Sequence, residues 1–328
     1  MSFEGMLHIL NEMTPETRVG IVAHTRPDGD AVGSVLGLAT VLREANIDAI
    51  PLLSDQYYVP KTYQWLQNFD AYSTPDQQKD KAFDYLFVLD TPSISRLSLG
   101  EQFLAQAQSV LLIDHHPRHD IPATLACVDT TASATAQLIW RLVEASRFEV
   151  SQAAAEACFV GLVTDTGSFQ HSNTDAVALK EASAMVARGA RPFEVSTKVF
   201  NNKTCAALEL ESCVMQRLTL ANNDKVAYSI ISHDDYVRLG AQKAEGENLV
   251  DIVRSVGGIE VALLITADPS GPRISLRSKT DFDVSAVAQQ IGGGGHRAAA
   301  GCKWPHSDTP LVEVIAEVLS MLPGAQEG

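Results

Sequence analysis

The chain has 328 residues, of which 45% are hydrophobic, and its formal net charge at pH 7 is -15. This length predicts about two domains with substantial cores. The negative charge argues against binding of long duplex nucleic acid, which requires many lysine and arginine contacts to phosphates. Because no segment resembles a membrane span or a signal peptide, we expect a cytoplasmic protein that does not bind a membrane. The five cysteines form no C-x-x-C pair, which favours buried free thiols over disulfides or zinc ligands.

Apolar strands and helices alternate through the first part of the chain. Apolar runs predict the strands, and helical periodicity predicts the helices that follow them. The predicted strands are residues 19–23, 48–53, 82–89 and 109–113, and the predicted helices are residues 31–43, 132–145, 151–162 and 175–188. This alternation is typical of an α/β domain with a mostly parallel sheet.

The first predicted strand leads into a turn that carries His24, Asp28 and Asp30. Ligands bind at the carboxyl ends of strands in open α/β sheets, and one imidazole with two carboxylates is a ligand set for a divalent cation. Alternatively, Asp28 caps the next helix, Gly29 makes the turn, and His24 has no part in binding. Taken alone, the motif favours this second interpretation.

Three later segments offer further acids and imidazoles. Asp90 follows the third strand, the triplet Asp114, His115 and His116 follows the fourth, and Asp165 lies in a turn-prone stretch after a helix. A capping or turn role could explain any one of these segments. Their joint occurrence with the first motif predicts a shared polynuclear metal site.

The second part of the chain predicts a smaller α/β domain. The predicted helices are residues 192–200, 205–216, 248–255, 284–290 and 310–322, and the predicted strands are residues 217–220, 226–231, 259–267 and 273–277. A run of four glycines, residues 292–295, follows one of these helices. Consecutive glycines let the backbone approach a ligand and turn N–H groups toward an anion. A flexible connector or a helix C-cap is the alternative.

Charged and polar residues near the glycine run favour an anchor for a phosphate or a base. Arginine suits this role because its planar fork binds phosphate bidentately and can stack on a base. The candidate substrate-binding residues are Ser275, Arg277, Gly293, Gly294, Gly295, His296 and Arg297.

The order of these motifs resembles the DHH phosphoesterase family with its DHH-associated C-terminal domain. The matching segments are His24-Thr-Arg-Pro-Asp28-Gly-Asp30, Asp90, Asp114-His115-His116, Asp165-Thr-Gly, Ile274-Ser-Leu-Arg277-Ser278 and Gly292-Gly-Gly-Gly-His296-Arg297. The resemblance spans nearly the whole chain and is strongest to the bacterial bifunctional oligoribonucleases that also dephosphorylate 3′-phosphoadenosine 5′-phosphate. It implies an active-site cleft between the two domains.

The resemblance also implies how the site residues divide their roles. One ion would be held by His24, Asp28 and Asp90, and a second ion by Asp30, Asp90, His115 and Asp165. His116 would act on the scissile phosphate as charge stabiliser or proton donor, while Asp114 orients the imidazoles. Two cations about 4 Å apart can clamp the attacking and leaving oxygens of a phosphoryl displacement. Mixed imidazole and carboxylate ligation favours Mn²⁺, with Mg²⁺ or Co²⁺ as lesser candidates.

By this resemblance, the expected substrates are short oligoribonucleotides, cleaved to mononucleotides, and 3′-phosphoadenosine 5′-phosphate, converted to AMP. One alternative is hydrolysis of linear dinucleotides derived from cyclic dinucleotide signals. Another is a nucleotide-binding module without catalysis, which the complete ligand set disfavours. The glycine-rich signature disfavours inorganic pyrophosphate as substrate. A homodimer is compatible with the sequence, which does not determine the oligomeric state.

The change of pattern along the chain suggests the domain boundaries. We predict a DHH metal-dependent phosphoesterase domain over residues 1–190, a helical linker over residues 191–216, and a DHH-associated substrate-binding domain over residues 217–328.

Overall fold

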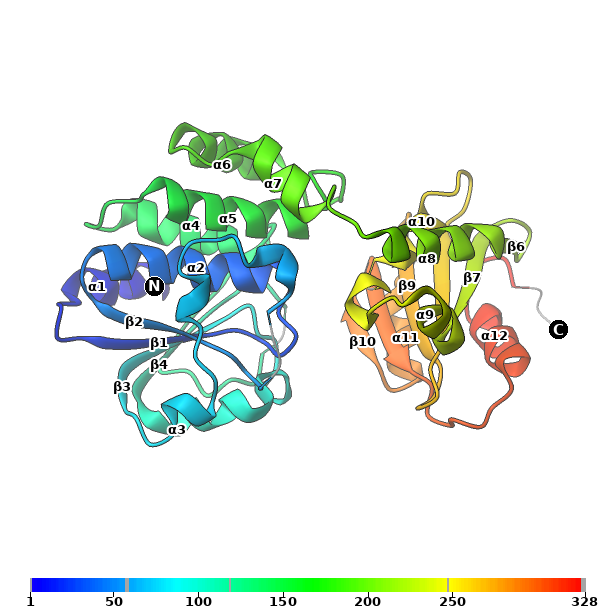
Figure 1. Ribbon diagram of the computed structural model, residues 1–328, viewed down its shortest axis with the longest axis horizontal. Coiled ribbons are helices and arrows are strands. Elements are labelled where there is room, and N and C mark those ends of the chain that lie inside the picture. The colour runs from blue at the N-terminus through cyan, green and yellow to red at the C-terminus, as the bar shows by residue number, and fades with distance from the viewer. Residues whose placement is uncertain (1, 57–58, 118, 247, 326–328) are drawn as a thin grey trace. The chain divides into compact units, whose positions relative to one another are not determined.

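The computed structural model describes residues 2–56, 59–117, 119–246 and 248–325 (Figure 1). The chain divides into two compact units, Met1–Asn202 and Lys203–Gly328. The division falls inside residues 191–216, for which a linker is predicted from sequence; the linking role itself stays a prediction. Within the described ranges, none of the helices has both the length and the apolar character that crossing a bilayer requires.

The first unit is built on a parallel sheet of five strands in the order β2-β1-β3-β4-β5. Its strands are β1 Arg18–Val22, β2 Asp48–Leu52, β3 Phe83–Leu89, β4 Ala107–Asp114 and β5 Leu125–Val128. Four of these strands are predicted from their apolar runs, and the predicted parallel α/β architecture is confirmed. The fifth strand, β5, is missed because it is only four residues long and mostly half-buried.

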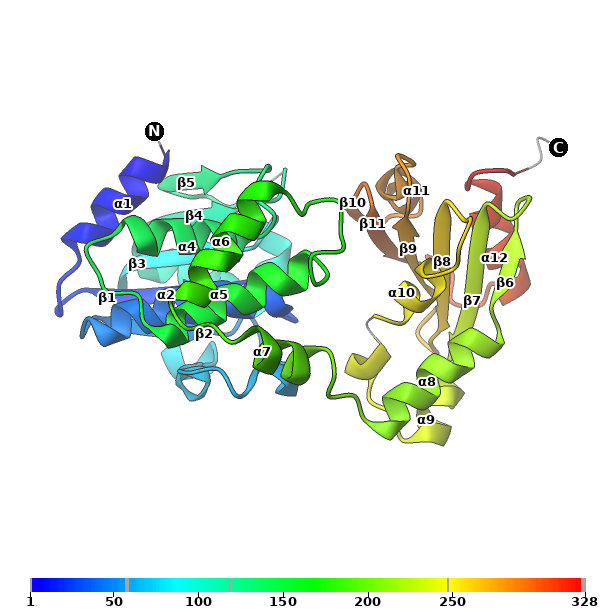
Figure 2. The same cartoon turned by 90° about the horizontal axis from the view of Figure 1, so that it is seen from above.

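Helices cover both faces of this sheet. The α-helices of this unit are α1 Ser2–Glu12, α2 Gly29–Glu44, α3 Gln102–Gln106, α4 Thr135–Ala145, α5 Gln152–Asp165, α6 Ala176–Ala187 and α7 Pro192–Val199, of which α6 packs on α5 and not on the sheet. The large core lies between the sheet and the layer of α2, α4 and α5, while a smaller core lies on the α3 face (Figures 1 and 2). Gly33 permits the close packing of α2 on α5, since a Cβ there would lie 2.5 Å from the carbonyl oxygen of Ala157.

Two helix boundaries differ from the predicted ones, and both differences matter for the site. The helix predicted over residues 132–145 begins at Thr135, so residues 132–134 form a loop. The helix predicted over residues 151–162 continues to Asp165. The prediction that Asp165 lies in a turn is therefore wrong: this residue is the last one of α5.

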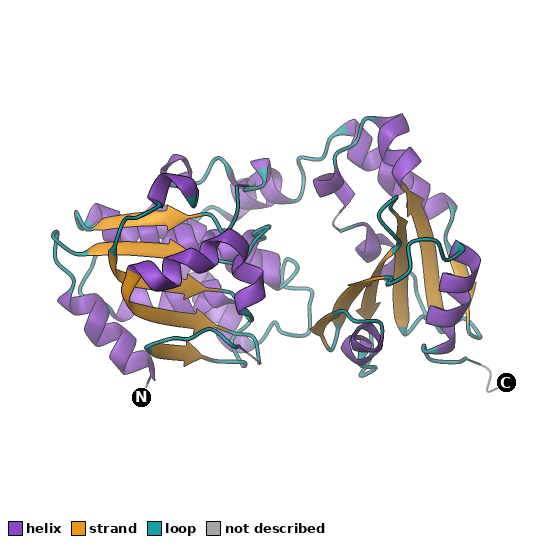
Figure 3. Ribbon diagram, turned by 90° about the horizontal axis from the view of Figure 1, so that it is seen from below, coloured by secondary structure: helices purple, strands orange, loops and turns teal. Residues whose placement is uncertain are grey.

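The second unit is built on a six-stranded mixed sheet in the order β10-β11-β9-β8-β7-β6, whose strands lie side by side in Figure 3. Its strands are β6 Thr219–Ala221, β7 Val226–Ser232, β8 Val261–Ala267, β9 Arg273–Ser278, β10 Gly294–His296 and β11 Ala299–Lys303. Its helices are α8 Cys205–Gln216, α9 His233–Leu239, α10 Leu249–Arg254, α11 Val284–Gln290 and α12 Leu311–Ser320. The helices α8 and α10 pack on one face of the sheet, and α11 and α12 pack on the other. The predicted second α/β domain is therefore confirmed.

The five cysteines lie within the described ranges and are free thiols, as predicted. Cys127 and Cys158 are buried. Cys213 and Cys302 are half-buried, and Cys205 is exposed at the first position of α8, so the expectation of burial is wrong for Cys205 and only partly met by the other two.

Candidate metal centre

The polar side chains predicted from the strand ends gather at the carboxyl edge of the first sheet. His24 lies two residues beyond the end of β1, Asp90 follows β3 directly, and Asp114 is the last residue of β4. The strand order places β1 between β2 and β3, so the chain leaves the middle of the sheet in opposite directions at this point. Open α/β sheets bind ligands at such a switch point.

The first cluster consists of His24, Asp28 and Asp90. The His24 Nδ1 lies 2.9 Å from the carbonyl oxygen of Thr25, to which only an Nδ1–H can donate. This contact turns Nε2 toward the acids, 3.7 Å from Asp28 Oδ2 and 3.6 Å from Asp90 Oδ2. These separations exceed hydrogen-bond length. Burial lowers the pKa of His24, but Asp28 and Asp90 outweigh it and raise that pKa to about 10 when no cation is present. A neutral imidazole with Nε2 directed at these carboxylates would suit a cation placed between them.

Asp28 has two functions at once, because its two oxygens face different groups. Oδ1 accepts the backbone N–H groups of Asp30 and Ala31, each at 3.1 Å, and so caps α2. Oδ2 faces His24 in the first cluster. The capping interpretation is confirmed, and it does not exclude the metal-site interpretation.

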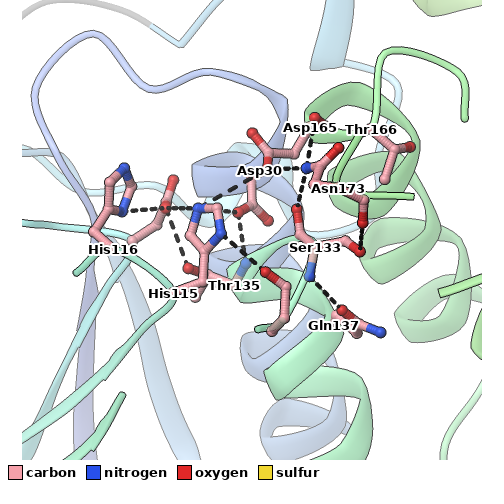
Figure 4. Close-up of polar contacts among 12 residues, drawn as sticks. Asp30, His115, His116, Ser133, Thr135, Gln137, Asp165, Thr166 and Asn173 are labelled. Carbon is pink, nitrogen blue, oxygen red and sulfur yellow. Dashed lines mark hydrogen bonds and ion pairs between the residues drawn. The ribbon is translucent and has the colours of Figure 1, made fainter. Parts of the chain in front are cut away.

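The second cluster consists of Asp30, His115 and Asp165 (Figure 4), and Asp90 lies beside it. The His115 Nε2 lies 3.9 Å from Asp30 Oδ2, 3.7 Å from Asp90 Oδ1 and 3.9 Å from Asp165 Oδ2. The opposite ring nitrogen, Nδ1, lies 3.3 Å from the carbonyl oxygen of Ala132. His115 therefore has the same arrangement as His24, with Nδ1 directed to a backbone carbonyl and Nε2 to the acids.

Crowding of negative charge is the main electrostatic feature of the site. Asp30 and Asp90 are each only 2% exposed. Burial raises the pKa of Asp30 well above its ordinary value, and the charges of Asp90 and Asp165 raise it further. Burial also raises the pKa of Asp165, together with the charges of Asp28 and Asp90. A divalent cation would relieve this repulsion, so the residues present fit a metal site.

Asp90 occupies an unusual backbone conformation. Its φ angle is 51°, in the left-handed region that residues with a Cβ rarely adopt. Its backbone N–H donates to the carbonyl oxygen of Ile113 at 3.1 Å, which connects the end of β3 to β4. Backbone strain of this kind persists where the surrounding structure enforces it, often at functional sites. The conformation directs the Asp90 carboxylate between the two clusters.

His116 and Asp114 form a pair beside the clusters. The His116 Nδ1–H donates to Asp114 Oδ1 at 2.7 Å, and the same oxygen accepts the His116 backbone N–H at 3.1 Å. Burial lowers the pKa of His116, but the hydrogen bond to Asp114 and the charge of Asp90 outweigh it and raise that pKa above its ordinary value. The pairing with Asp114 thus favours the protonated form of the imidazole, with Nε2 on the side of the ring opposite Asp114.

Sequence reasoning missed the polar residues that surround the second cluster. Asn173 donates its side-chain N–H₂ to the carbonyl oxygen of Ser133 at 3.0 Å and to Asp165 Oδ2 at 3.4 Å (Figure 4). Ser133 in turn donates its hydroxyl to the carbonyl oxygen of Asn173, and its N–H donates to Gln137 Oε1 at 2.7 Å. Thr135 contacts both Asp30 and Asp90. These residue types carry no metal-ligand signal in a sequence.

The candidate substrate-binding residues of the second unit lie on three neighbouring strands. In the sheet register, Arg277 of β9 pairs with Ala299 of β11, which pairs with His296 of β10. Opposite residues in antiparallel strands point to the same face, so Arg277 and His296 share one face. Ser275 lies two residues before Arg277 and faces the same way. The register therefore brings Ser275, Arg277 and His296 to one surface.

Two of the candidate glycines serve packing within the second unit. A Cβ at Gly293 would lie 2.3 Å from the carbonyl oxygen of Gly301, and one at Gly295 would lie 2.5 Å from that of Ala299. Gly294 and Gly295 belong to the ladder of β10 and β11. Gly292 follows the end of α11 at a φ angle of 88°, and the next N–H, that of Gly293, donates to the carbonyl oxygen of Ala288 at 2.8 Å, so the helix C-cap alternative holds for Gly292. Arg297 donates to the carbonyl oxygen of Asp281 at 2.9 Å from Nε, a contact that holds its guanidinium within the fold.

Arg277 is held by an acid from a neighbouring helix. Its Nε lies 3.5 Å from Asp251 Oδ1, and its Nη1 donates to the carbonyl oxygen of Leu276 at 3.1 Å. Arg254 lies at the same distance, 3.5 Å, from this Asp251 oxygen. Two guanidinium groups thus share one carboxylate, which leaves an excess positive charge on this part of the unit.

Comparison with known proteins identifies two domains of known families. Residues 18–162 match the DHH family, N-terminal domain, and residues 223–322 match the DHHA1 domain. The bifunctional oligoribonuclease and PAP phosphatase NrnA of Bacillus subtilis is 26% identical over 89% of this chain and 91% of its own length. The protein of the same name from Thermus thermophilus is 27% identical over 87% of this chain and 84% of its own length.

A solved structure gives the same result for the fold. The crystal structure of an exopolyphosphatase-related protein from Bacteroides fragilis covers 97% of this chain and 96% of its own, with a TM-score of 0.89 and 22% identity. The sequence motifs fall within these two matched domains, and the structure brings those of the first domain together in one site. The chain therefore belongs to the DHH family of metal-dependent phosphoesterases and combines a DHH domain with a DHHA1 domain.

Proposed function

We propose that this protein hydrolyses short oligoribonucleotides to mononucleotides and 3′-phosphoadenosine 5′-phosphate to AMP. The observation that carries this proposal is the gathering of two imidazoles and four carboxylates, with His116 beside them, at one edge of the first sheet. The relatives named for these two activities align along nearly the whole chain and match most of their own length. The cytoplasm is the compartment where we expect such substrates.

Two divalent metal ions, most suitably Mn²⁺, are the proposed cofactors. The first cluster would hold one ion, and the second cluster with Asp90 would hold the other. Bound there, the ions would stabilise negative charge on the attacking and leaving oxygens of the phosphoryl displacement. The preference for Mn²⁺ rests on the mixture of imidazole and carboxylate donors, because a site for Mg²⁺ is more often built from oxygen ligands alone.

His116 is the proposed proton donor or charge stabiliser at the scissile phosphate. Its Nδ1–H donates to Asp114, which fixes the ring orientation and supports the charged imidazolium. The Nε2–H then lies on the opposite side of the ring. From there it can donate to an oxygen of the phosphate as charge develops on that oxygen.

The second unit is proposed to bind the part of the substrate away from the scissile bond. Ser275, Arg277 and His296 share one face of the sheet, and Arg254 adds a further guanidinium beside Asp251. A surface with excess positive charge and hydroxyl and imidazole donors suits a phosphate. We propose the same role for the backbone N–H groups of Gly293, Gly294 and Gly295 and for Arg297.

One assay tests the proposal. Labelled dinucleotides to decanucleotides and 3′-phosphoadenosine 5′-phosphate are incubated with the protein and Mn²⁺, and the products are separated. We expect mononucleotides and AMP, no product with a chelator, and strongly reduced product with Asp165→Asn. Asp129→Asn is the matched control, because Asp129 belongs to neither cluster and pairs with Arg141 instead. Intact substrates under all these conditions would contradict the proposal.

The alternative activity on linear dinucleotides from cyclic dinucleotide signalling is tested in the same assay. Linear diadenylate and diguanylate are compared with dinucleotides of other base composition. A large preference for the two signalling products would favour the alternative. Binding of nucleotides without any product would favour a module that lacks catalysis.

A further inference from the structure

Thr135 connects two carboxylates of the candidate metal centre. Its backbone N–H donates to Asp30 Oδ2 at 2.7 Å, and its hydroxyl donates to Asp90 Oδ1 at 3.1 Å. The next residue, Ala136, donates its N–H to Asp30 Oδ1 at 2.8 Å. Both oxygens of Asp30 are therefore fixed by the first turn of α4 (Figure 4).

The beginning of α4 depends on this carboxylate. The N-cap position is occupied by Ala134, whose methyl group cannot accept a hydrogen bond. The first N–H groups of a helix need acceptors and favour negative charge. Asp30 supplies both from α2, so the main chain of α4 holds Asp30 whatever side chain residue 135 carries.

The contact with Asp90 has a different basis, since it depends on the Thr135 hydroxyl alone. Asp90 directs Oδ2 toward His24, at 3.6 Å, and Oδ1 toward His115, at 3.7 Å. Thr135 donates to Oδ1, which is the oxygen on the side of the second cluster. Because Thr135 is fully buried, removal of its hydroxyl takes this donor away without opening a direct contact with solvent.

We propose that Thr135 is a positioning residue for the ion of the second cluster, an inference that rests on the proposed function. Its hydroxyl donates to Asp90 Oδ1 and holds this oxygen toward the space between Asp30, His115 and Asp165. Oδ2, which faces His24, receives no bond from Thr135. Loss of the hydroxyl should therefore weaken one ion selectively. Removal of such supporting hydrogen bonds typically lowers metal affinity about 10- to 100-fold.

The test measures Mn²⁺ binding to the metal-free, full-length chain by isothermal titration calorimetry. Thr135→Val removes the hydroxyl and keeps the branched shape, whereas Thr135→Ser keeps the hydroxyl. We expect two ions on the wild-type chain. Thr135→Val should bind one ion unchanged and the other about 10- to 100-fold more weakly. Thr135→Ser should bind both ions as the wild type does, and excess Mn²⁺ should restore hydrolysis by Thr135→Val.

A matched control separates this effect from the general loss of a threonine hydroxyl. Thr131 donates its hydroxyl to Asp129 Oδ1 at 2.6 Å, in the loop before α4 and outside the clusters, so Thr131→Val should bind both ions unchanged. If thermal melting shows that metal-free Thr135→Val is poorly folded, Thr135→Ala is measured in its place.

Three outcomes would overturn the inference: the same binding curve for the hydroxyl-free variant and the wild type, equal weakening of both ions, or equal weakening by Thr135→Ser. A wild-type chain that takes up no Mn²⁺ contradicts the proposed function itself. A wild-type chain that binds two ions and hydrolyses oligonucleotides, combined with an unchanged Thr135→Val, contradicts only the role of Thr135.

Discussion

Asp90 connects the two clusters because each of its oxygens faces a different imidazole. Oδ2 lies 3.6 Å from the His24 Nε2, and Oδ1 lies 3.7 Å from the His115 Nε2. Removal of this carboxylate should therefore damage both proposed metal sites, whereas removal of His24 should damage one. We expect Asp90→Ala to lose both tightly bound ions and His24→Ala to retain one, as counted by elemental analysis of the purified proteins.

The backbone at Asp90 requires a second variant as control. Alanine is unfavourable at a φ angle of 51°, whereas asparagine tolerates this conformation. Asp90→Asn therefore removes the charge with less disturbance of the backbone. An Asp90→Ala protein that keeps two tightly bound ions and full turnover would rule out the bridging role.

Arg277 and His116 should affect different kinetic constants. Contacts that are equally strong in ground and transition states set KM, whereas groups that act on charge developing at phosphorus set kcat. Arg277→Ala should raise KM for oligonucleotides about 10- to 100-fold, which corresponds to loss of a charge-assisted contact of about 1.5–3 kcal/mol. His116→Ala should lower kcat and retain its metal ions. Steady-state kinetics with a dinucleotide measures both effects.

A small activated phosphodiester provides the control for Arg277, because such a substrate has no remote part to anchor. Its hydrolysis should hardly respond to Arg277→Ala. Since Arg277 lies beside Asp251, thermal melting must also show that the variant remains folded. Equal impairment with the small ester and the dinucleotide would mean that Arg277 serves the chemical step or the fold.

The acids and imidazoles of the site could be predicted from sequence, but their supporting residues could not. A carboxylate or imidazole at a strand end has chemistry that a pattern reveals, and the structure brings these side chains together; their roles as ligands stay predictions. Thr135, Ser133 and Asn173 act through hydroxyl, amide and backbone groups, which occur everywhere in proteins. Their importance depends on residues more than 30 positions away, such as Asp30 and Asp90.

Among the helices, α9 combines two sources of stability at its first turn. Ser232 and Asp235 form a capping box, in which each side chain accepts the backbone N–H of the other. Asp235 also accepts hydrogen bonds from Arg217 Nη1 at 2.6 Å and Nη2 at 2.8 Å. These bonds from Arg217 hold the pKa of Asp235 well below its ordinary value.

This depressed pKa predicts how the stability of the second unit depends on pH. A carboxyl group with a lowered pKa in the folded state stabilises the protein above its unfolded pKa of about 3.9, and the contribution is lost as the pH falls below that value. Asp235→Asn should lower the free energy of unfolding at pH 7 by about 1.5–3 kcal/mol and by less at pH 3. Denaturant unfolding at both pH values measures the difference.

The neighbouring acid provides a matched control for Asp235. Asp234 is exposed in the same first turn, so Asp234→Asn removes one negative charge near the helix N-terminus without removing the capping box or the Arg217 contacts. Asp234→Asn should therefore change the free energy of unfolding much less than Asp235→Asn does. If Asp235→Asn lowers the free energy of unfolding equally at pH 3 and pH 7, the charge of the Asp235 carboxylate does not contribute to the stability.

Elements with a clear apolar pattern were predicted from sequence, whereas the 11-residue helix α1 and several short strands were not. The apolar runs of β1, β3, β4 and β8 are continuous, so their pattern is clear. The hairpin of β10 and β11 was missed because its first strand is three residues, two of them glycine. The strand predicted at residues 217–220 begins only at Thr219, because Arg217 occupies the C-cap position of α8. The capping box at Ser232 marks the start of α9 in the sequence, a signal that hydrophobic periodicity does not contain.

At the scale of the whole molecule, the charge balance favours short substrates. A net charge of -15 opposes the approach of a long polyanion, and the proposed anchoring residues are few. We expect a larger kcat/KM for a dinucleotide than for a long single strand at the same salt concentration. Equal values for the two substrates would indicate an exonuclease that feeds long strands along an open channel.

Each of the two units encloses its own hydrophobic cores, and the chain passes from one to the other at Asn202 and Lys203. Chains of this kind often unfold in more than one step. Both proposed ion sites are built from the first unit alone, so added Mn²⁺ should raise the melting temperature of one calorimetric transition and leave the other unchanged. Free Mn²⁺ at 100 times its dissociation constant would add about 2.7 kcal/mol per site to the free energy of unfolding of the first unit. The melting temperature of the transition that does not respond then serves as an internal reference from the second unit. In a single scan, the melting temperature of the first unit can be compared with it for every substitution at the metal centre.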